Sequence, residues 1–486
     1  MESVLPLNLW SDERRTPRSS AEAGAHASDE ADPPGVRSRF QQDYDRLLFS
    51  TPVRRLADKT QVWPMDENDG VRTRLTHSHE VANLARSIGT WVVKISGEAL
   101  GAADLHDVIQ PILSSIGLAH DLGNPPFGHQ GEVAISEWFK HRESWIFTKQ
   151  NEGDDNDDLQ DAIPSDLWPE FTKFDGNPQS LRLLTKLQTS HGRVGLDLTA
   201  ATLAASLKYP VDTRMCDKDK PAIKKFGYFE SERGLVEWIR EQTGLSEGQR
   251  HPLTWIMEAC DDIAYSVLDV DDLLKKEIIS PDDVYVVLEH NPFLRDSDVI
   301  GRLGSKFKVV NDEDRRAEIR RDIKIGYMRA YLIEDLIVEA SRTFINSAAA
   351  ILALEHEEPL MQQSRLCDAL KGVARQYAFS HRNVLRTEAI GAAAINVLMS
   401  DFWSAIHMRE DWTNILSPRV GARARYIYSM ISPNYLEEAN CQVDGNAGAM
   451  RYRELRLLTD MVSGMTDTFA LKTSRDLEAV PHVDRA

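Results

Sequence analysis

Two histidines and an aspartate stand within ten residues of one another in the stretch HDLGNPPFGH, residues 120–129. An imidazole nitrogen and a carboxylate oxygen are both good ligands for divalent metals, so His120 and Asp121 form a candidate metal-binding pair. Adjacent residues on a helix diverge by about 100°, but two short side chains can still converge on one ion where a helix ends. The alternative is a pair of capped helices joined by a proline-rich turn, with the histidines on the surface.

The residues that follow add a candidate proton-transfer pair. Gly123 is a plausible helix stop, and Pro125–Pro126 restricts the loop and begins the next segment. That segment places His129 and Glu132 three residues apart, hence on one face of a helix. A carboxylate behind an imidazole can set its tautomer and raise its basicity, which favours general acid–base chemistry.

A second set of candidate ligands precedes the strongly amphipathic segment in VRTRLTHSHEVANLARSIG, residues 71–89. Either His77 or His79 can be a ligand, while the other faces water or caps the helix. A lone histidine near a helix start is usually only a polar surface residue. These two gain weight because a His–Asp pair follows about 40 residues later.

A third piece is WIMEACDDIAYSVLDVDDLL, residues 255–274, which is apolar nearly all round and is expected to form a buried helix. Asp261, Tyr265 and Asp269 recur at four-residue steps and so form one stripe along it. A buried carboxylate needs a partner, a metal or a hydrogen-bond network. In the alternative reading the aspartates line a wet surface, and we expect Asp271 and Asp272 to do so.

The elements that must position these residues are helices. Apolar residues recur at three and four along five segments, and hairpin signals and alternating β-branched runs are scarce; the segments are 80–95, 131–139, 198–207, 255–274 and 330–352. The fold class is therefore predicted to be all-α, with a soft boundary near residue 280 and an acidic surface insertion at 151–161. Residues 1–39, rich in Ser, Ala, Pro and charge, are predicted to be a disordered arm.

Composition bounds the setting in which this chemistry would occur. The chain has 486 residues, 42% of them hydrophobic, without an apolar run that looks long enough for a membrane helix or a secretory signal. Four scattered cysteines without CxxC spacing indicate a reducing, cytoplasmic compartment. A formal charge of −19 argues against broad coating of nucleic acid, and an anionic substrate would need a local cationic pocket.

Together these pieces resemble the HD-domain metal-dependent phosphohydrolases, whose pattern is H…HD…D. The sequences around these residues are more specific. They resemble the deoxyguanosinetriphosphate triphosphohydrolase branch, in its long bacterial type, in the stretches RTRLTHSHEV, HDLGNPPFGHQGE and EACDDIAYSVLD. FSTPVRRLADKTQVWP at 49–64 and LRLLTDMVSGMTDTFAL at 455–471 are similar to that branch as well. The resemblance covers the chain from about residue 40 to its C-terminus.

The resemblance implies roles position by position. The metal ligands would be His77, His120, Asp121 and Asp261, the last preferred over Asp262 because it stands four residues before Tyr265. The catalytic pair would be His129 and Glu132. The implied substrate contacts are Gln61 and Val62 to the base, Tyr265 and Asp269 to the sugar, and Lys208 and Lys225 to the phosphates. His79 stands at a position that varies within the family motif, and we expect its side chain to point away from the metal.

The resemblance also implies a reaction and partners. The family reaction hydrolyses a deoxynucleoside triphosphate to deoxynucleoside and intact triphosphate with a divalent metal, Mn²⁺ or Mg²⁺ or another transition metal. A second Mg²⁺ can arrive with the phosphates. The expected layout is an HD-domain catalytic core at 40–280 and a C-terminal helical region packed on it at 281–486. A homo-oligomer, of which a hexamer is one form, is expected, with no membrane partner.

Three other functions remain open at this stage. Within enzymes they are a triphosphohydrolase of broad dNTP specificity and an HD phosphodiesterase acting on another nucleotide. From another class comes a regulatory or single-stranded-DNA-binding protein on an HD scaffold. Single-stranded DNA is also a candidate effector, and the basic, aromatic run RVGARARYIYSM at 419–430 is the place where it would bind. The alternative for that run is a solvated helix with core tyrosines.

Overall fold

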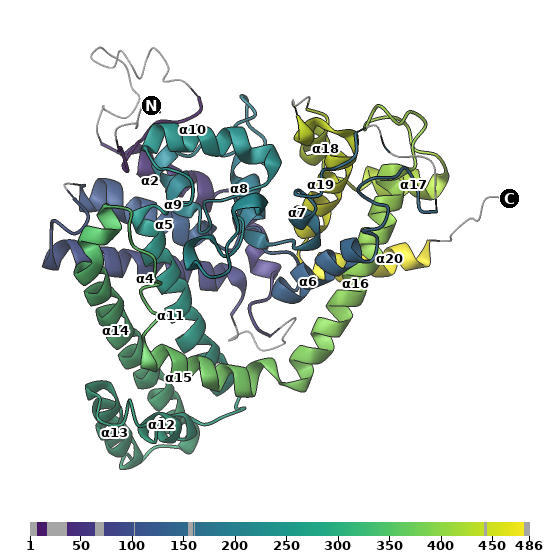
Figure 1. The fold of residues 1–486 in the computed structure, drawn as a ribbon. Helices are drawn as coiled ribbons and strands as arrows, with labels where there is room; N and C mark the ends of the chain where they lie inside the picture. Colours follow the sequence, from purple (N-terminus) through teal and green to yellow (C-terminus); the bar gives the residue numbers. More distant parts are fainter. Residues whose placement is uncertain are drawn as a thin grey trace.

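The computed structural model describes residues 7–16, 36–63, 72–101, 103–153, 159, 161–441 and 445–480. Within these ranges the chain is helical without a β-strand, and only two isolated β-bridges occur, Thr60 with Thr73 and Arg409 with Arg419 (Figure 1). The predicted all-α fold class is confirmed. Five residues of the predicted acidic insertion, 154–158, and residue 160 lie outside the described residues.

The helices vary from single turns to more than thirty residues. In chain order their bounds are α2 Arg39–Leu48, α3 Thr51–Arg55, α4 Arg74–Ile95, α5 Gln110–Ala119, α6 Gly128–Lys140, α7 Pro169–Thr172, α8 Gly176–Thr185, α9 Ala200–Ser206, α10 Arg233–Thr243, α11 Pro252–Lys275, α12 Pro281–Glu289, α13 Asp298–Asn311, α14 Ala317–Leu352, α15 Arg365–Ala374, α16 Arg382–His407, α17 Ala422–Ser429, α18 Pro433–Ala439, α19 Met450–Ser463 and α20 Asp467–Ala479. Short π-helical turns at Leu105–Ile109 and Arg375–Phe379 lead into α5 and out of α15.

Two apolar cores organise these helices. The first gathers α4, α5, α11, α14 and α15, with the α12–α13 pair packed beyond α14 (Figure 1). The second gathers α6, α8, α10, α16, α19 and α20. Each core draws residues from both sides of position 280, so the chain crosses from one to the other more than once. The boundary between 40–280 and 281–486 stays a prediction.

Helix α16 runs from the first core into the second (Figure 1). Among the described residues it is the one helix long and apolar enough to span a membrane, with a mean hydropathy of 1.4 over its most apolar window. This finding differs from the expectation that no apolar run is long enough to form a membrane helix. The face that carries Ile395, Leu398 and Phe402 is buried, and the helix packs on α6, α19 and α20. Core helices of soluble proteins meet the same length and composition test.

The N-terminal segment differs from its prediction as a disordered arm. Residues 7–16 pack on α2 and on the starts or ends of α9, α10 and α11: Leu9 is buried, and its carbonyl oxygen lies 2.8 Å from His251 Nε2, directly before α11. Arg14 is buried as well and forms a 2.9 Å ion pair with the fully buried Asp43. Composition missed this segment because its few anchoring side chains have no periodicity. Residues 1–6 and 17–35 lie outside the described residues.

Asp271 and Asp272 do not line a wet surface, and that expectation is wrong. Both carboxylates are buried at the end of α11, where Arg72 bonds Asp271 Oδ2 at 2.7 Å and Asp272 Oδ1 at 2.5 Å. Arg72 stands just before α4 and thus ties the start of that helix to α11. A basic residue close in space but about 200 positions away in sequence makes this burial possible.

We predict that Arg72→Ala lowers the free energy of unfolding by about 3–5 kcal/mol, because it leaves the buried Asp272 without its ion-pair partner and removes the nearest of the three cations around Asp271. Urea denaturation followed by circular dichroism measures the change. The control is Arg295→Ala, which breaks the exposed ion pair with Asp296 and should change stability by no more than about 0.5 kcal/mol. A loss at Arg72 as small as that of the control would contradict the role given to this ion pair.

Candidate active site

Three mutually packed helices bring the candidate ligands together. His77 lies in the first turn of α4, His120 directly follows α5, and Asp261 lies in the middle of α11. Helices α4, α5 and α11 pack on one another through the first apolar core. A helix end and two helix faces therefore meet at one point, although 43 and 141 residues separate neighbouring members of the set along the chain.

The distances within this cluster are those of groups that can share one ion. His77 Nε2 and His120 Nε2 each lie 3.6 Å from the same oxygen, Asp261 Oδ1. One ligand atom from each of the three residues can be chosen so that all lie within 4.8 Å of one another. His77 is buried, whereas Asp261 keeps part of its carboxylate exposed, so the cluster is closed on one side and open on the other.

The orientation of His120 shows that the cluster fits a metal. Its Nδ1 lies 2.7 Å from the carbonyl oxygen of Gly117, an acceptor, so Nδ1 carries the hydrogen of the neutral imidazole. Its Nε2 then presents a lone pair, and this buried atom has no hydrogen-bond partner within the described chain. Metal-ligating histidines are commonly held in this way, with the second ring nitrogen bonded to a backbone carbonyl.

Asp121 lies at the edge of the same cluster. Its Oδ1 is 3.7 Å from His120 Nε2 and accepts a 2.5 Å hydrogen bond from Asn124 Nδ2. Its Oδ2 forms a 2.6 Å ion pair with Arg74. Burial alone would raise the pKa of Asp121, but the cation of Arg74, helped by the two imidazoles, lowers it to about 2. The carboxylate is thus kept in the charged form that a metal ligand needs.

The structure also separates the ambiguous neighbours of these residues. His79 is exposed, as expected, whereas His77 is buried in the cluster. Asp262 Oδ1 accepts a 2.6 Å bond from Lys371 of α15 and does not belong to the cluster. The preference for His77 and Asp261 is therefore consistent with the side-chain positions, and their role as ligands remains a prediction.

The loop after His120 is held by residues from the far end of the chain. Phe127 has a positive φ of 62°, and its backbone N–H donates a 2.9 Å bond to Asp467 Oδ1 at the start of α20. Lys59 Nζ bonds the carbonyl oxygens of Asn124 at 2.5 Å and Ser463 at 3.1 Å. Lys59 and Asp467, which hold this loop, were not identified from the sequence. Both lie in stretches that resemble the family, 49–64 and 455–471.

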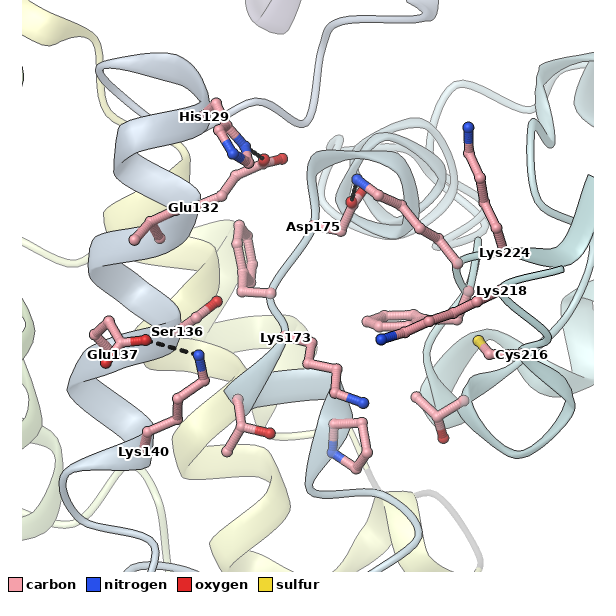
Figure 2. Close-up of a pocket in the computed structure, with 17 residues that line it drawn as sticks. His129, Glu132, Ser136, Glu137, Lys140, Lys173, Asp175, Cys216, Lys218 and Lys224 are labelled. Atoms are coloured by element: carbon pink, nitrogen blue, oxygen red, sulfur yellow. Dashed lines mark hydrogen bonds and ion pairs between the residues drawn. The ribbon is translucent and has the colours of Figure 1, made fainter. Parts of the chain in front are cut away.

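His129 and Glu132 form the predicted pair on α6 (Figure 2). His129 Nδ1 lies 3.0 Å from Glu132 Oε2, and Glu132 Oε1 accepts a 2.7 Å bond from the backbone N–H of Gly176. The bond to Glu132 is the largest cause that raises the pKa of His129. The imidazole is otherwise exposed, so Nε2 is free to meet a ligand.

The two predicted phosphate-binding lysines lie on opposite sides of the candidate site. Lys208 Nζ is 3.3 Å from Asp261 Oδ2 and 4.0 Å from Glu258 Oε1. Burial opposes the charge on Lys208, but these carboxylates, Asp261 first, raise its pKa. Lys225 forms an ion pair with Asp175, the residue that caps α8, and lines the same cavity as His129 and Glu132.

The predicted sugar contacts lie one turn apart on α11. The ring of Tyr265 stacks on Phe379 with 5.7 Å between centroids and 12° between planes. Phe379 was missed in the sequence because it belongs to the π-helical turn after α15. Asp269 is buried with Oδ2 unpartnered among the described residues, and burial raises its pKa well above the usual range. An unpaired buried oxygen here is available to a ligand hydroxyl.

Gln61 and Val62, the predicted base contacts, stand beside residues 64–71, which lie outside the described residues. Val62 is buried in the first core, and Gln61 Oε1 is a buried oxygen without a partner in the described chain. Their contact with a base stays a prediction.

The run 419–430 is mostly occupied with structural contacts. Arg419 is buried and lies 3.4 Å over the ring of Tyr428, whose hydroxyl bonds the carbonyl of Ile415. Arg423 bonds Asp401 at 2.9 Å. Only Arg425 and Tyr426 turn an arginine and an aromatic ring of this run to the solvent. These contacts favour the alternative of a helix with core tyrosines over a surface for single-stranded DNA.

The sequence matches none of the protein-family models, but it is similar to curated proteins over nearly its whole length. It is 33% identical over 476 residues to a deoxyguanosinetriphosphate triphosphohydrolase-like protein of Listeria innocua, covering 95% of this chain and 97% of that protein. The deoxyguanosinetriphosphate triphosphohydrolases of Enterobacter sp. strain 638 and Salmonella typhimurium are each 31% identical to it, covering 91% and 92% of this chain and 94% and 96% of theirs.

We predict that Glu132→Gln lowers the pKa of His129 toward the ordinary histidine value of about 6.5, because the hydrogen bond and charge of Glu132 are what raise it. The substitution keeps the size of the side chain and removes its charge. NMR titration of the histidine ring signals measures the shift, with the His129 signal assigned by its absence in His129→Ala. A titration that coincides with that of the wild type would contradict the pairing.

Proposed function

Because the chain belongs to the deoxyguanosinetriphosphate triphosphohydrolase family, we propose that it hydrolyses dGTP to deoxyguanosine and inorganic triphosphate by attack of water at the α-phosphorus. The proposed class of reaction rests on membership in this family. The observation that supports chemistry in this chain is the His77–His120–Asp261 cluster, with the buried lone pair of His120 Nε2 directed into it.

The proposed metal ligands are His77, His120, Asp121 and Asp261. Two imidazoles and two carboxylates suit Mn²⁺ or Mg²⁺, and another transition metal is compatible with the same donors. A divalent ion held there would polarise a phosphate oxygen and stabilise the negative charge on the oxygens of the α-phosphoryl group during the attack. The partly exposed carboxylate of Asp261 marks the side from which a phosphate would approach.

Proton transfer is proposed for His129, with Glu132 as the residue that holds its ring. Glu132 bonds Nδ1, so Nε2 is the atom that can exchange a proton with the reacting oxygens. Lys208 and Lys225 would neutralise the triphosphate in a chain that otherwise has a formal charge of −19. The departing 5′-oxygen needs a proton to leave as deoxyguanosine, and His129 is the proposed source or relay of it.

The sugar would lie along α11. Since Asp261, Tyr265 and Asp269 follow one another by single turns, an α-phosphate near Asp261 places the deoxyribose over the next turn. Tyr265, braced by Phe379, presents its ring to the C2′ side, where an added hydroxyl would clash. The unpartnered Asp269 Oδ2 can pair with the 3′-hydroxyl. Gln61 and Val62 are proposed to contact the guanine.

From the family resemblance we further propose a cytoplasmic homo-oligomer, with a hexamer as one form. The HD-domain core would occupy 40–280 and the C-terminal helical region 281–486. The alternative within the same chemistry is hydrolysis of all dNTPs at similar rates. The assignment of substrate is tested by incubating the protein with each dNTP and with GTP, in Mn²⁺ or Mg²⁺, and separating the products. Equimolar deoxyguanosine and triphosphate are expected, whereas release of pyrophosphate or orthophosphate would contradict the reaction.

We predict that Asp261→Ala reduces the affinity for Mn²⁺ by more than the 10–100-fold that loss of an outer-shell partner typically costs. The reason is the loss of the oxygen nearest to both imidazoles. Metal bound per chain after equilibrium dialysis measures the effect without any need for turnover. The matched control is Asp262→Ala, one position along the same helix, where the carboxylate bonds Lys371 instead. Equal metal content in the two variants would contradict the assignment of ligands.

A further prediction concerns the sugar. The wild type should prefer dGTP to GTP and should turn over 2′,3′-dideoxy-GTP poorly, since Asp269 Oδ2 would stay buried without a partner at a cost of about 1–3 kcal/mol, or about 5- to 150-fold in kcat/KM. Asp269→Ala should remove that penalty, and Tyr265→Ala should relax the discrimination against GTP. Steady-state kinetics on the three nucleotides tests this. Equal wild-type rates on GTP and dGTP would contradict the placement of the sugar.

A further inference from the structure

A lysine-rich cavity opens directly beside the His129–Glu132 pair. It has a volume of about 530 Å³, within the range of small-ligand sites, and lies between α6, the segment around α7 and the loop that carries the 3-10 turn Thr213–Met215 (Figure 2). His129 and Glu132 stand at one end of it, and Lys140 stands further along the same face of α6. Val133, Phe174 and Phe226 give part of the lining an apolar character.

The charges that line this cavity are not balanced. Among the described residues three carboxylates line it, and each is engaged: Glu132 with His129, Glu137 with Lys140, and Asp175 with Lys225. Three further lysines also line it, Lys173, Lys218 and Lys224, and none has an ion-pair or hydrogen-bond partner within the described chain. In a strongly acidic protein, three unpaired cations around one cavity form a local site for an anion.

The three lysines extend from the reaction centre outward. Burial is the largest cause that lowers the pKa of Lys224; the charge of Glu258 opposes it, and the nearby cations Lys208 and Lys225 add to it. Lys173 and Lys218 extend into the space between α6 and the opposite loop (Figure 2). No arginine is among the described residues that line the cavity. Lysines are flexible point charges without a rigid fork, so they suit an anion that binds and leaves rather than one that is held in a fixed pose.

We propose that Lys173, Lys218 and Lys224 form a binding site for the inorganic triphosphate that is released when a nucleotide is hydrolysed beside His129. The inference rests on the proposed function, because that reaction supplies a linear polyanion next to the open end of the cavity. A nucleotide carries the same triphosphate group, so free triphosphate and intact dGTP must be distinguished by experiment.

The test measures binding of sodium tripolyphosphate to the metal-free full-length protein by isothermal titration calorimetry. The triple variant Lys173→Gln, Lys218→Gln, Lys224→Gln should bind it at least about tenfold more weakly than the wild type, because three charge-assisted contacts are lost. The matched control replaces three exposed lysines elsewhere, Lys94, Lys308 and Lys472, with Gln and so makes the same change in net charge. An equal loss in both triple variants, or no loss in the cavity variant, would overturn the proposal. Circular dichroism checks that both variants are folded.

A second arm separates the two sources of the triphosphate group. His129→Ala protein without metal is titrated with dGTP, alone and with the three cavity substitutions. We expect the affinity for dGTP to depend on these lysines much less than the affinity for tripolyphosphate does. An equal dependence would overturn the assignment of this site to the product. In the active enzyme, the inhibition constant for tripolyphosphate should rise by at least about tenfold in the triple variant relative to the KM for dGTP.

The failure of this inference is distinguishable from failure of the proposed function. If the protein hydrolyses dGTP but the triple variant binds tripolyphosphate as the wild type does, the site is refuted and the function stands. If the protein does not hydrolyse dGTP but the lysine-dependent binding is present, the function is refuted and the polyanion site is supported.

Discussion

The close packing of residues 120–131 against the start of α8 is the constraint on which the candidate site depends. A side-chain carbon at Gly123 would come within 2.1 Å of the carbonyl oxygen of Gly176, so the two segments approach with no room for a larger residue. Glu132 bonds the backbone N–H of the same Gly176. These contacts hold both ends of the segment to one point of α8. His120 at one end and His129 at the other are thereby kept at a fixed relation, which the proposed metal ligand and the proposed proton-transfer residue would both need.

The rest of the molecule supports that segment from both cores. Asp467 at the start of α20 accepts the backbone N–H of Phe127, and Lys59 links Asn124 to the end of α19. On the other side, Arg74 fixes Asp121, and Arg72 ties the start of α4 to α11. The buried charges around the site are therefore structural partners for one another. Because nearby cations compensate these carboxylates, the acidic chain can bury several negative charges around the candidate site without being destabilised by them.

The local part of the site could be predicted from sequence, because it depends on short spacings. The distance of three residues between His129 and Glu132 gave the pairing. The resemblance to the family, in which the matching aspartate stands four residues before the tyrosine, implied Asp261 rather than Asp262. What could not be predicted depends on contacts across the chain. Phe379 behind Tyr265 and Arg72 beside Asp271 and Asp272 have no periodic signal that links them to their partners. The ordered segment at 7–16 was missed for the same reason, since a few anchoring residues do not change the composition of an arm.

The central claim is that water attacks the α-phosphorus at the His77–His120–Asp261 cluster, so that the nucleoside leaves with its own 5′-oxygen. The most direct measurement is hydrolysis of dGTP in water enriched in oxygen-18, with the products analysed by phosphorus NMR and mass spectrometry. The account predicts that the label appears in the inorganic triphosphate, on a terminal phosphorus, and is absent from deoxyguanosine. Label in deoxyguanosine, or in released pyrophosphate or orthophosphate, would contradict it.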